Sequence, residues 1–400
     1  MTALFPLENR IQNYAWGSRR ALAELSGRAA PTEVPEAELW MGAHPLACSR
    51  AGHAAGPTLL ELIASAPVAM LGERVAKTYG KLPFLMKLLA AAEPLSLQAH
   101  PSEAQARAGY DREEAAGVPL TAPTRSYKDP HHKPELICAL TPFSALVGFR
   151  PTRDTAHLFA ALGVPDLTRT VHALRHEPAP VALHGLFELV TRSSAEARRE
   201  LADTTLAACR ARRDSVSDFS AELAWGVRIG ELYPGDAGIV LALALNLVVL
   251  EPGEAVYLPA GNLHAYLEGT GVEIMASSDN VLRGGLTPKH VDAAELLRVL
   301  DFHAEPVRLV ATETHGSLVR YITPAREFDL SRLELTTGEL VVDAVSGPEI
   351  VVVTRGELTL RRADESTTLA AGASVFVPAA GGAYTIAGAG TAFRARVNDA

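Results

Sequence analysis

Hydrophobic residues recur at helical spacing in the first third of the chain, after two motifs that start helices. Thr58 and Glu61 form one capping box and Ser102 and Gln105 form a second, each followed by residues with helical periodicity. We therefore expect helices beginning after Thr58 and after Ser102.

Other apolar runs have strand character. The run Leu82–Leu97 contains Pro94, which predicts two buried extended pieces joined at the proline. Glu135–Val147 also looks extended, with Pro142 as a bend, and we interpret the apolar run Gly238–Leu250 as a further strand. The first part of the chain is thus expected to be mainly β.

The pattern changes twice more along the chain. Residues 153–230 show 3.6-residue periodicity and good helix formers, which predicts a helical insertion. Thr287 as N-cap and Pro288 at the first helical position predict another helix. From about Phe302 onward short alternating strands separated by glycine-rich turns are typical of a sandwich or jelly-roll barrel.

One internal repeat links the two β regions. LEPGEAVYLPAG (250–261) aligns without gaps with LAAGASVFVPAA (369–380), so both segments are interpreted as the same barrel hairpin. Continued, the alignment places Ala383 where the first copy has His264. We therefore expect a second barrel with a structural role and without that ligand.

Length and charge limit the function. Four hundred residues predict two or three domains, and a net charge of −9 argues against nucleic acid or an anionic membrane surface as a partner. Three scattered cysteines exclude a disulfide framework or a cysteine-based zinc site. The N-terminus lacks leader character and the apolar run near 240–250 is too short to span a bilayer, so we expect a cytoplasmic protein.

Polar groups accumulate at strand ends in three places, most densely in the segment 257–290. Gln98 and His100 lie on one face of an extended piece, Glu135 starts the next, and His264 follows a turn. Two imidazoles, one carboxylate and one amide oxygen suit zinc. A histidine at a strand end is also commonly a hydrogen-bonded structural residue, so spacing alone leaves both interpretations open.

Basic residues near these positions are candidates for holding an anionic substrate. Lys87 interrupts an apolar strand, Lys133 lies two residues before Glu135, and Arg283 precedes a glycine pair. Each could instead be a surface cation with a buried stem. The segment Ser277–Asn280 is predicted to be a turn with Asx hydrogen bonds to its own backbone.

Three motifs closely resemble type I mannose-6-phosphate isomerases, also called phosphomannose isomerases. They are FLMKLLAAAEPLSLQAHP, HKPELICALTPFSALVGFRP and YLPAGNLHAYLEGTGVEIMASSDNVLRGGLTPKHVD, and NYAWGS and ELWMGAHP fit as well. The resemblance covers the chain nearly end to end. It implies a mainly β fold with two cupin-type jelly-roll barrels and an α-helical domain. The catalytic barrel would comprise residues 1–152 and 231–301, the helical insertion 153–230, and the barrel without metal ligands 302–400.

The same resemblance implies one zinc ion per chain and interconversion of mannose 6-phosphate and fructose 6-phosphate through a cis-enediolate, in mannose and GDP-mannose precursor metabolism. Carried over by position, the zinc ligands are Gln98, His100, Glu135 and His264. Arg283 matches the catalytic arginine, and the matching residues that line the substrate pocket are Ser96, Lys87, Lys133 and Glu273. We expect a monomer.

Two positions depart from the family pattern. Ser102-Glu103 replaces the usual basic residue after the Q-x-H-P motif, and His131 stands where asparagine commonly precedes HKPE. Both could alter how the phosphate or the pocket edge is bound, and neither is a proposed metal ligand.

The reaction requires ring opening and proton transfer between neighbouring carbons. We expect Glu273 or a zinc-bound water to act as the base, and His132 or Lys133 to assist ring opening. Arg283, Lys133 and the metal would stabilise the developing negative charge.

Two alternatives remain, a second kind of enzyme and a protein without catalysis. One is a cupin metal oxygenase, against which the glutamine in place of a third histidine argues. The other is a sugar-phosphate binding protein without catalysis, against which the complete ligand set and Arg283 argue.

Overall fold

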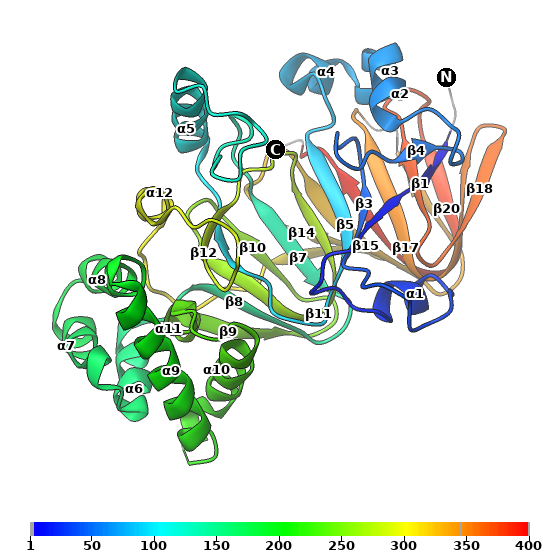
Figure 1. The fold of residues 1–400 in the computed structure, drawn as a ribbon. Helices are drawn as coiled ribbons and strands as arrows, with labels where there is room; N and C mark the ends of the chain where they lie inside the picture. Colours follow the sequence, from blue (N-terminus) through cyan, green and yellow to red (C-terminus); the bar gives the residue numbers. More distant parts are fainter. Residues whose placement is uncertain (1–3, 216, 344–345, 399–400) are drawn as a thin grey trace.

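The apolar runs of the chain form the central strands of two antiparallel sheets. The computed structural model describes residues 4–215, 217–343 and 346–398. Within them each sheet has ten strands, so the protein is mainly β with helices, as the sequence predicts. Figure 1 shows a helical group on one side of the first sheet and the second sheet on the other.

Strand β11 (His264–Ala276) is the axis of the first sheet. It pairs antiparallel with β5 (Phe84–Ala91), β6 (Leu97–Ala99), β7 (Glu135–Ala139) and β8 (Phe143–Phe149). The two extended pieces predicted on either side of Pro94 are thus confirmed as β5 and β6. The remaining strands of this sheet are β2 (Arg10–Gln12), β3 (Glu38–Met41), β9 (Leu245–Leu250), β10 (Ala255–Leu258) and β12 (Leu282–Gly285).

Strand alternation directs the polar residues of the first sheet to one side. On β7, Ile137 and Ala139 join an apolar cluster within the first sheet, whereas Leu136 and Cys138 join a cluster shared with the second sheet. Since side chains alternate along a strand, Glu135 lies on the same face as Ile137. The carboxylate therefore lies on the face of the first sheet that carries Ile137 and Ala139, which we call the inner face.

The second sheet is built on β17 (Glu349–Arg362) and β20 (Tyr384–Arg396), which pair along most of their length. Its other strands from the C-terminal part are β13 (Thr312–His315), β14 (Leu318–Tyr321), β15 (Asp329–Leu335), β16 (Glu339–Val342), β18 (Glu365–Ala370) and β19 (Ser374–Val377). The chain from Phe302 onward is therefore confirmed as β.

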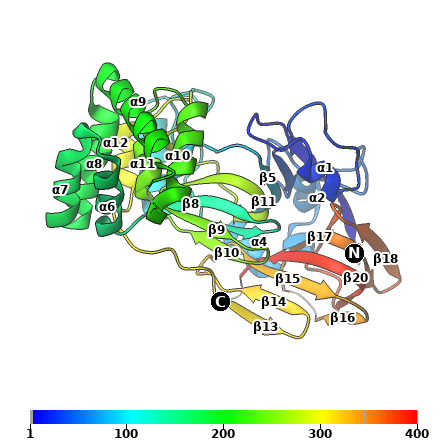
Figure 2. The same ribbon diagram turned by 90° about the horizontal axis from the view of Figure 1, so that it is seen from below.

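The start of the chain differs from the predicted division at residue 302. Strand β1 (Phe5–Glu8) pairs with β19, and β4 (Arg50–Ala51) pairs with β1, so both belong to the second sheet. Figure 2 shows the dark blue strand at the start of the described chain next to the strands of the second sheet. Local patterning cannot reveal a strand whose partner lies more than three hundred residues away.

The internal repeat corresponds to two matching hairpins. β10 leads into the 13-residue β11, which begins at His264, and β19 leads into the 13-residue β20, which begins one residue after Ala383. Gly253 and Gly372, which the alignment equates, both have positive φ, at 93° and 86°. The shared turn chemistry is confirmed.

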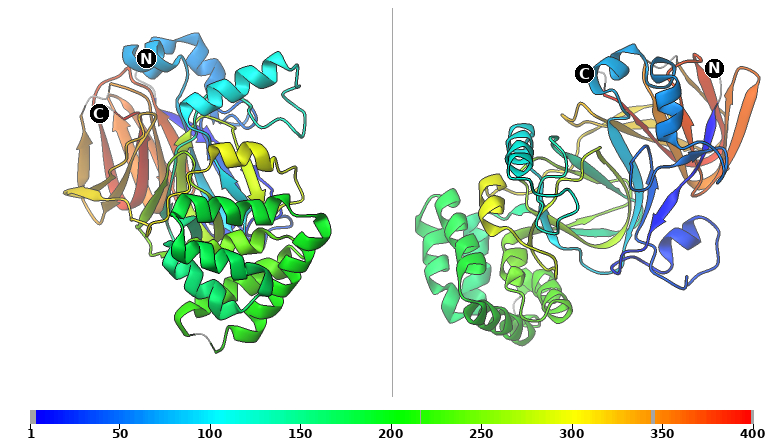
Figure 3. Two further views of the ribbon diagram at one scale, coloured as in Figure 1. Left: turned by 90° about the vertical axis from the view of Figure 1, so that its left-hand side faces the viewer. Right: turned by 45° about the horizontal axis from the view of Figure 1, so that its top comes forward.

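The helical insertion is confirmed and is longer than predicted. Its helices are α6 (Thr152–Leu162), α7 (Thr168–His176), α8 (Ala179–Arg192), α9 (Ala195–Arg212), α10 (Ser220–Leu232) and α11 (Gly238–Ala244), with short 3₁₀ turns at Pro165–Leu167 and Ser217–Phe219. Figure 3 shows them packed as one group. The predicted strand Gly238–Leu250 is wrong in its first half, because that part is α11 and only β9 is extended. Every residue of α11 is buried, so it carries no amphipathic signal.

Both predicted capping boxes are present, at α2 (Leu59–Ser65) and α5 (Glu103–Ala115). The predicted helix start at Thr287 is wrong: α12 (Ala293–Val299) begins later, and Asp292 caps it by accepting from the Glu295 N–H. The remaining helices are α1 (Ala21–Leu25), α3 (Pro67–Leu71) and α4 (Glu73–Tyr79). No helix among the described residues is long and apolar enough to cross a membrane.

Candidate active site

Three predicted metal ligands converge on the inner face of the first sheet. Ligand atoms of His100, Glu135 and His264 all lie within 4.8 Å of one another, and all three residues are buried. Glu135 Oε2 is 3.3 Å from His100 Nε2 and 3.4 Å from His264 Nε2. Residues 164 positions apart in the sequence meet here because β11 returns beside β6 and β7. Among the described residues, these three form the group of His, Cys, Asp or Glu side chains that is placed to hold a metal ion.

The protonation of this cluster suits a cation. The other ring nitrogens are held by the backbone, since Nδ1 of His100 lies 2.7 Å from the Asn280 carbonyl and Nδ1 of His264 lies 3.0 Å from the Asn262 carbonyl. These bonds direct both Nε2 atoms inward. Nε2 of His100 is buried without a hydrogen-bond partner among the described residues, and burial lowers the pKa of His100 to about 4. A neutral imidazole with a free lone pair is a metal ligand, so the residues fit zinc.

Gln98 lies next to the cluster in the sheet. On β6 it is paired with His264 of β11 on one side and with Arg283 of β12 on the other. Directly paired residues of antiparallel strands project to the same face, so all three side chains lie on the site face. Ser96, two residues before Gln98 and half-buried, precedes the same strand.

Lys87 is buried between two carboxylates. Its Nζ lies 2.8 Å from Glu273 Oε2 and 3.3 Å from Glu38 Oε1, and 5.2 Å from the centroid of the Trp40 ring. Trp40 Nε1 donates to the other oxygen of Glu38 at 2.7 Å. The charge of Lys87 is therefore compensated on both sides. The sequence analysis assigned no role to Glu38 and Trp40, although their alternation in ELWM places both on the face that Lys87 shares.

Glu273 combines burial with a lysine partner. Burial raises the pKa of this carboxyl and Lys87 opposes the effect, while the charges of Glu135 and Glu38 add to it, so that the pKa stays above its usual range. The hydroxyl of Tyr266 is buried without a hydrogen-bond partner among the described residues, and the charge of Glu273 adds to burial in raising its pKa. Tyr266 was missed from the sequence, although it lies two residues after His264.

The two residues before Pro134 point in different directions. Lys133 Nζ is 2.9 Å from Glu135 Oε1, and although burial raises the pKa of Glu135, Lys133 and His100 bring it well below its usual range. His132 instead bonds Glu327 of the C-terminal part, with 2.9 Å between Nε2 and Oε1. The structure thus brings Lys133 to the predicted site but does not bring His132 into contact with it.

Arg283 supplies positive charge without an ion-pair partner among the described residues. It is half-buried, and burial lowers its pKa. Burial and then the neighbouring charge of Arg283 lower the pKa of Lys289. Arg283 also adds, after burial and Arg125, to the lowering of the pKa of Lys128. This edge of the site is therefore electropositive in an acidic protein.

The turn Ser277–Asn280 does more than the predicted Asx turn. Ser278 does accept from the Asn280 N–H at 3.3 Å, but the Asn280 side chain bonds the neighbouring segment 128–131. Its oxygen accepts from the Lys128 N–H at 2.7 Å and its amide donates to the His131 carbonyl at 2.8 Å. The predicted Asx bond of Asn280 to its own turn is therefore wrong, because its side chain bonds residues 128–131 instead.

Residues 4–152 match the family model for the catalytic domain of type I phosphomannose isomerase. The mannose-6-phosphate isomerase of Escherichia coli strain K12 is 40% identical over 390 residues, covering 96% of this chain and 97% of that protein. The chain belongs to the mannose-6-phosphate isomerases. The rat mannose-6-phosphate isomerase is 34% identical, with 89% and 88% of the two chains covered.

Solved mannose-6-phosphate isomerases share the whole fold. The apo form from Salmonella typhimurium has a TM-score of 0.90 at 38% identity and covers 100% of both chains. A mannose-6-phosphate isomerase bound with zinc and yttrium gives the same TM-score and identity, with 99% of each chain covered. Neither the oxygenase nor the non-catalytic alternative finds support among these relatives.

Proposed function

We propose that the chain interconverts D-mannose 6-phosphate and D-fructose 6-phosphate and binds one zinc ion through Gln98, His100, Glu135 and His264. The observation that carries this proposal is the buried His-Glu-His cluster in a member of this family. Zinc at such a site would act as a Lewis acid toward a sugar oxygen. The relative bound with zinc supports the choice of metal.

In the proposed mechanism Glu273 removes the proton beside the carbonyl and returns one to the neighbouring carbon. Its carboxylate is buried beside Lys87, and its pKa is raised toward neutral pH, where a general base is most effective. The enediolate would carry negative charge on oxygen. Arg283 and Lys133 are the cations we assign to it, and each well-placed donor contributes roughly 3 to 4 kcal/mol.

The substrate would be held by Ser96, Lys87, Lys133 and Arg283. Lys87 and Lys133 already have carboxylate partners, whereas Arg283 has none among the described residues. Together with Lys128 and Lys289, Arg283 offers the electropositive edge that a phosphate group requires. The role of His132 in ring opening stays a prediction, since its ring bonds Glu327 and, among the described residues, contacts none of the proposed metal ligands or catalytic residues.

We further propose that both sheets close as cupin-type jelly-roll barrels, with the catalytic barrel in 1–152 and 231–301, the insertion in 153–230 and the second barrel in 302–400. Separate apolar clusters inside each sheet and the repeated hairpin support this division. β1 and β4 depart from it by their pairing, and α11 departs from it because the helical insertion continues past residue 230. We also propose that the protein is a monomer, since one chain supplies every proposed site residue. Its three free cysteines suggest that it acts in a reducing cytoplasm.

The decisive measurement follows fructose 6-phosphate formed from mannose 6-phosphate, together with the zinc content of the protein. Activity should vanish with a chelator and return with zinc. His264→Ala should lose stoichiometric zinc and activity together. Retained zinc in that variant would overturn the ligand assignment, and activity unaffected by metal removal would overturn the proposed chemistry.

A further inference from the structure

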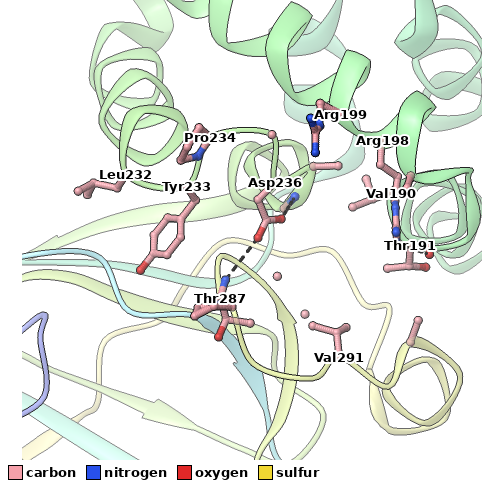
Figure 4. A pocket seen from close by; sticks show the side chains of 18 residues that line it. Val190, Thr191, Arg198, Arg199, Leu232, Tyr233, Pro234, Asp236, Thr287 and Val291 are labelled. Atoms are coloured by element: carbon pink, nitrogen blue, oxygen red, sulfur yellow. Dashed lines mark hydrogen bonds between the residues drawn. The ribbon is translucent and has the colours of Figure 1, made fainter.

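The turn between α10 and α11 bonds the backbone directly after β12. Oδ2 of Asp236 accepts from the Leu286 N–H at 2.7 Å and the Thr287 N–H at 3.3 Å. Oδ1 accepts from the Gly238 N–H at 2.8 Å, so one carboxylate joins the first turn of α11 to the strand end. Figure 4 shows Asp236 beside Thr287, with the helical insertion above them. This contact is long-range, because 50 residues separate Asp236 from Leu286.

The backbones meet too closely here for side chains to share the space. A Cβ on Gly238 would lie 2.9 Å from Asp236 Oδ1 and 3.1 Å from the Leu286 nitrogen, and a Cβ on Gly285 would lie 3.1 Å from Gly238 Cα. Gly285 has φ of 134° and Leu286 has φ of 55°. For Leu286 this left-handed conformation costs about 1 kcal/mol or more, so hydrogen bonds must hold it.

Packing holds only one side of this segment, because the Leu286 side chain is buried in the same apolar cluster as Leu282 and Leu296. A cavity of about 680 Å³ lies between α8, α9 and residues 284–293 (Figure 4). Gly284, Thr287 and Val291 border it, together with Asp236. The strand end is thus fixed by its pairing with β6, by the buried Leu286 side chain and by the carboxylate, which bonds the backbone on the side that faces the cavity.

The same turn also contacts the strand that pairs with β12. The hydroxyl of Tyr233 donates to the Pro94 carbonyl at 2.7 Å, shortly before β6. β6 and β12 carry Gln98 and Arg283, which are direct partners in the ladder. Residues 233–238 therefore bond the backbone next to the ends of both strands. If one of these bonds is lost, the strand end can shift, and the shift would move Gln98 or Arg283.

We propose that Asp236 is a positioning residue for Arg283: it fixes the end of β12 and so places the guanidinium over the site. The helical insertion, which contributes no proposed ligand or catalytic group, would act on the reaction through this carboxylate. The inference rests on the proposed role of Arg283. Asparagine at position 236 has the same size but only one acceptor oxygen and no charge. Its NH2 group would face one of the three N–H groups, so Asp236→Asn loses at least one hydrogen bond and the charge that strengthens the others.

The test compares Asp236→Asn with Asp203→Asn, an exposed aspartate of α9, for kcat, KM and zinc content. Asp236→Asn should lower kcat by about 10- to 100-fold, as expected for displacement of a catalytic group by an ångström or less, with zinc retained. Asp203→Asn should match the parent. Gly238→Ala should reproduce the loss, whereas Gly185→Ala, whose added Cβ meets nothing within 4 Å, should not.

Combining Asp236→Asn with a substitution of Arg283 distinguishes a positioning role of Asp236 from a general structural effect. In an Arg283→Lys background, Asp236→Asn should lower kcat little further, since the group it positions is already altered. A full, additive fall in that background would overturn the proposal, as would an unchanged kcat in Asp236→Asn while Arg283→Lys is impaired. Full activity in Arg283→Lys and Arg283→Ala would instead overturn the role of Arg283. If Asp236→Asn does not fold, Gly238→Ala in both backgrounds gives the same decision.

Discussion

At the scale of single residues, the site contains two lysines in ion pairs and one arginine without an ion-pair partner among the described residues. Lys87 lies between Glu38 and Glu273, and Lys133 is paired with Glu135. The charges of these two lysines are therefore balanced by carboxylates, whereas Arg283 has no such partner among the described residues. The sequence identified these cations, but it could not show which of them has a partner, since Glu38 is 49 residues from Lys87.

Glu273→Gln tests the general base. The amide cannot accept a proton, so kcat should fall by about 10² to 10⁴ while zinc content stays stoichiometric. Steady-state kinetics and metal analysis measure both quantities. Glu339→Gln, at an exposed position of β16, is the matched control and should leave kcat unchanged. Near-full turnover in Glu273→Gln would exclude this carboxyl as the base.

The pair of His132 and Glu327 predicts a pH-dependent contribution to stability. The hydrogen bond with Glu327 raises the pKa of His132, so protonation favours the folded state. The stabilisation is therefore complete below the unfolded histidine pKa of about 6.5 and is lost as pH rises through the folded value. The stabilisation lost in this way is on the order of 0.5 kcal/mol, because the pair is partly exposed and screened by solvent.

Urea denaturation of the parent and Glu327→Gln at pH 6 and pH 8.5 measures this contribution. The difference in unfolding free energy between the two proteins should be larger at pH 6. Glu313→Gln is the control, since Glu313 and His315 form an exposed pair 4.0 Å apart. An equal difference at both pH values would show that the charged pair contributes nothing.

At the scale of elements, local signals were reliable where the element is stabilised locally. The capping boxes at Thr58 and Ser102 and the periodic insertion could be predicted because each signal lies within one helix. α11 could not, since a fully apolar run has no periodicity to distinguish helix from strand. Thr287-Pro288 has a good start signal, but Asp236 bonds the backbone there and holds it in a non-helical turn.

Substitution at the two candidate N-caps distinguishes the observed helix start from the predicted one. Asp292→Ala should destabilise the protein by about 1 kcal/mol, because it leaves the Glu295 N–H without its acceptor. Thr287→Ala should have a smaller effect, since its hydroxyl accepts only from the exposed Lys289 N–H. Thermal denaturation of both variants compares the losses. A larger loss in Thr287→Ala would contradict the observed cap.

At the scale of the whole molecule, one apolar cluster lies between the two sheets and contains residues of both. Met86 and Val272 of the first sheet belong to the same buried cluster as Val352, Phe376 and Phe393 of the second. The second sheet thus covers the outer face of the first, whatever else it does. The repeat predicted a second barrel with a structural role, but the sequence could not show that its sheet packs on the first one.

Removal of residues 302–400 tests that dependence. The fragment 1–301 should be insoluble or unfolded, because it exposes the shared cluster and leaves β1 without β19. Co-expression of 1–301 with 302–400 is the control and should recover soluble material. Circular dichroism and gel filtration distinguish the outcomes, and a folded, active 1–301 fragment would contradict the shared core.

The central place of β11 has a consequence for how the protein is made. β5, β7 and β8 leave the ribosome more than a hundred residues before the strand that joins them. At roughly 5 to 20 residues per second they wait for seconds with unpaired edges, the state in which nascent chains aggregate. The helices of the insertion can fold in that interval. Expression yield should therefore depend on chaperones and on translation speed before β11.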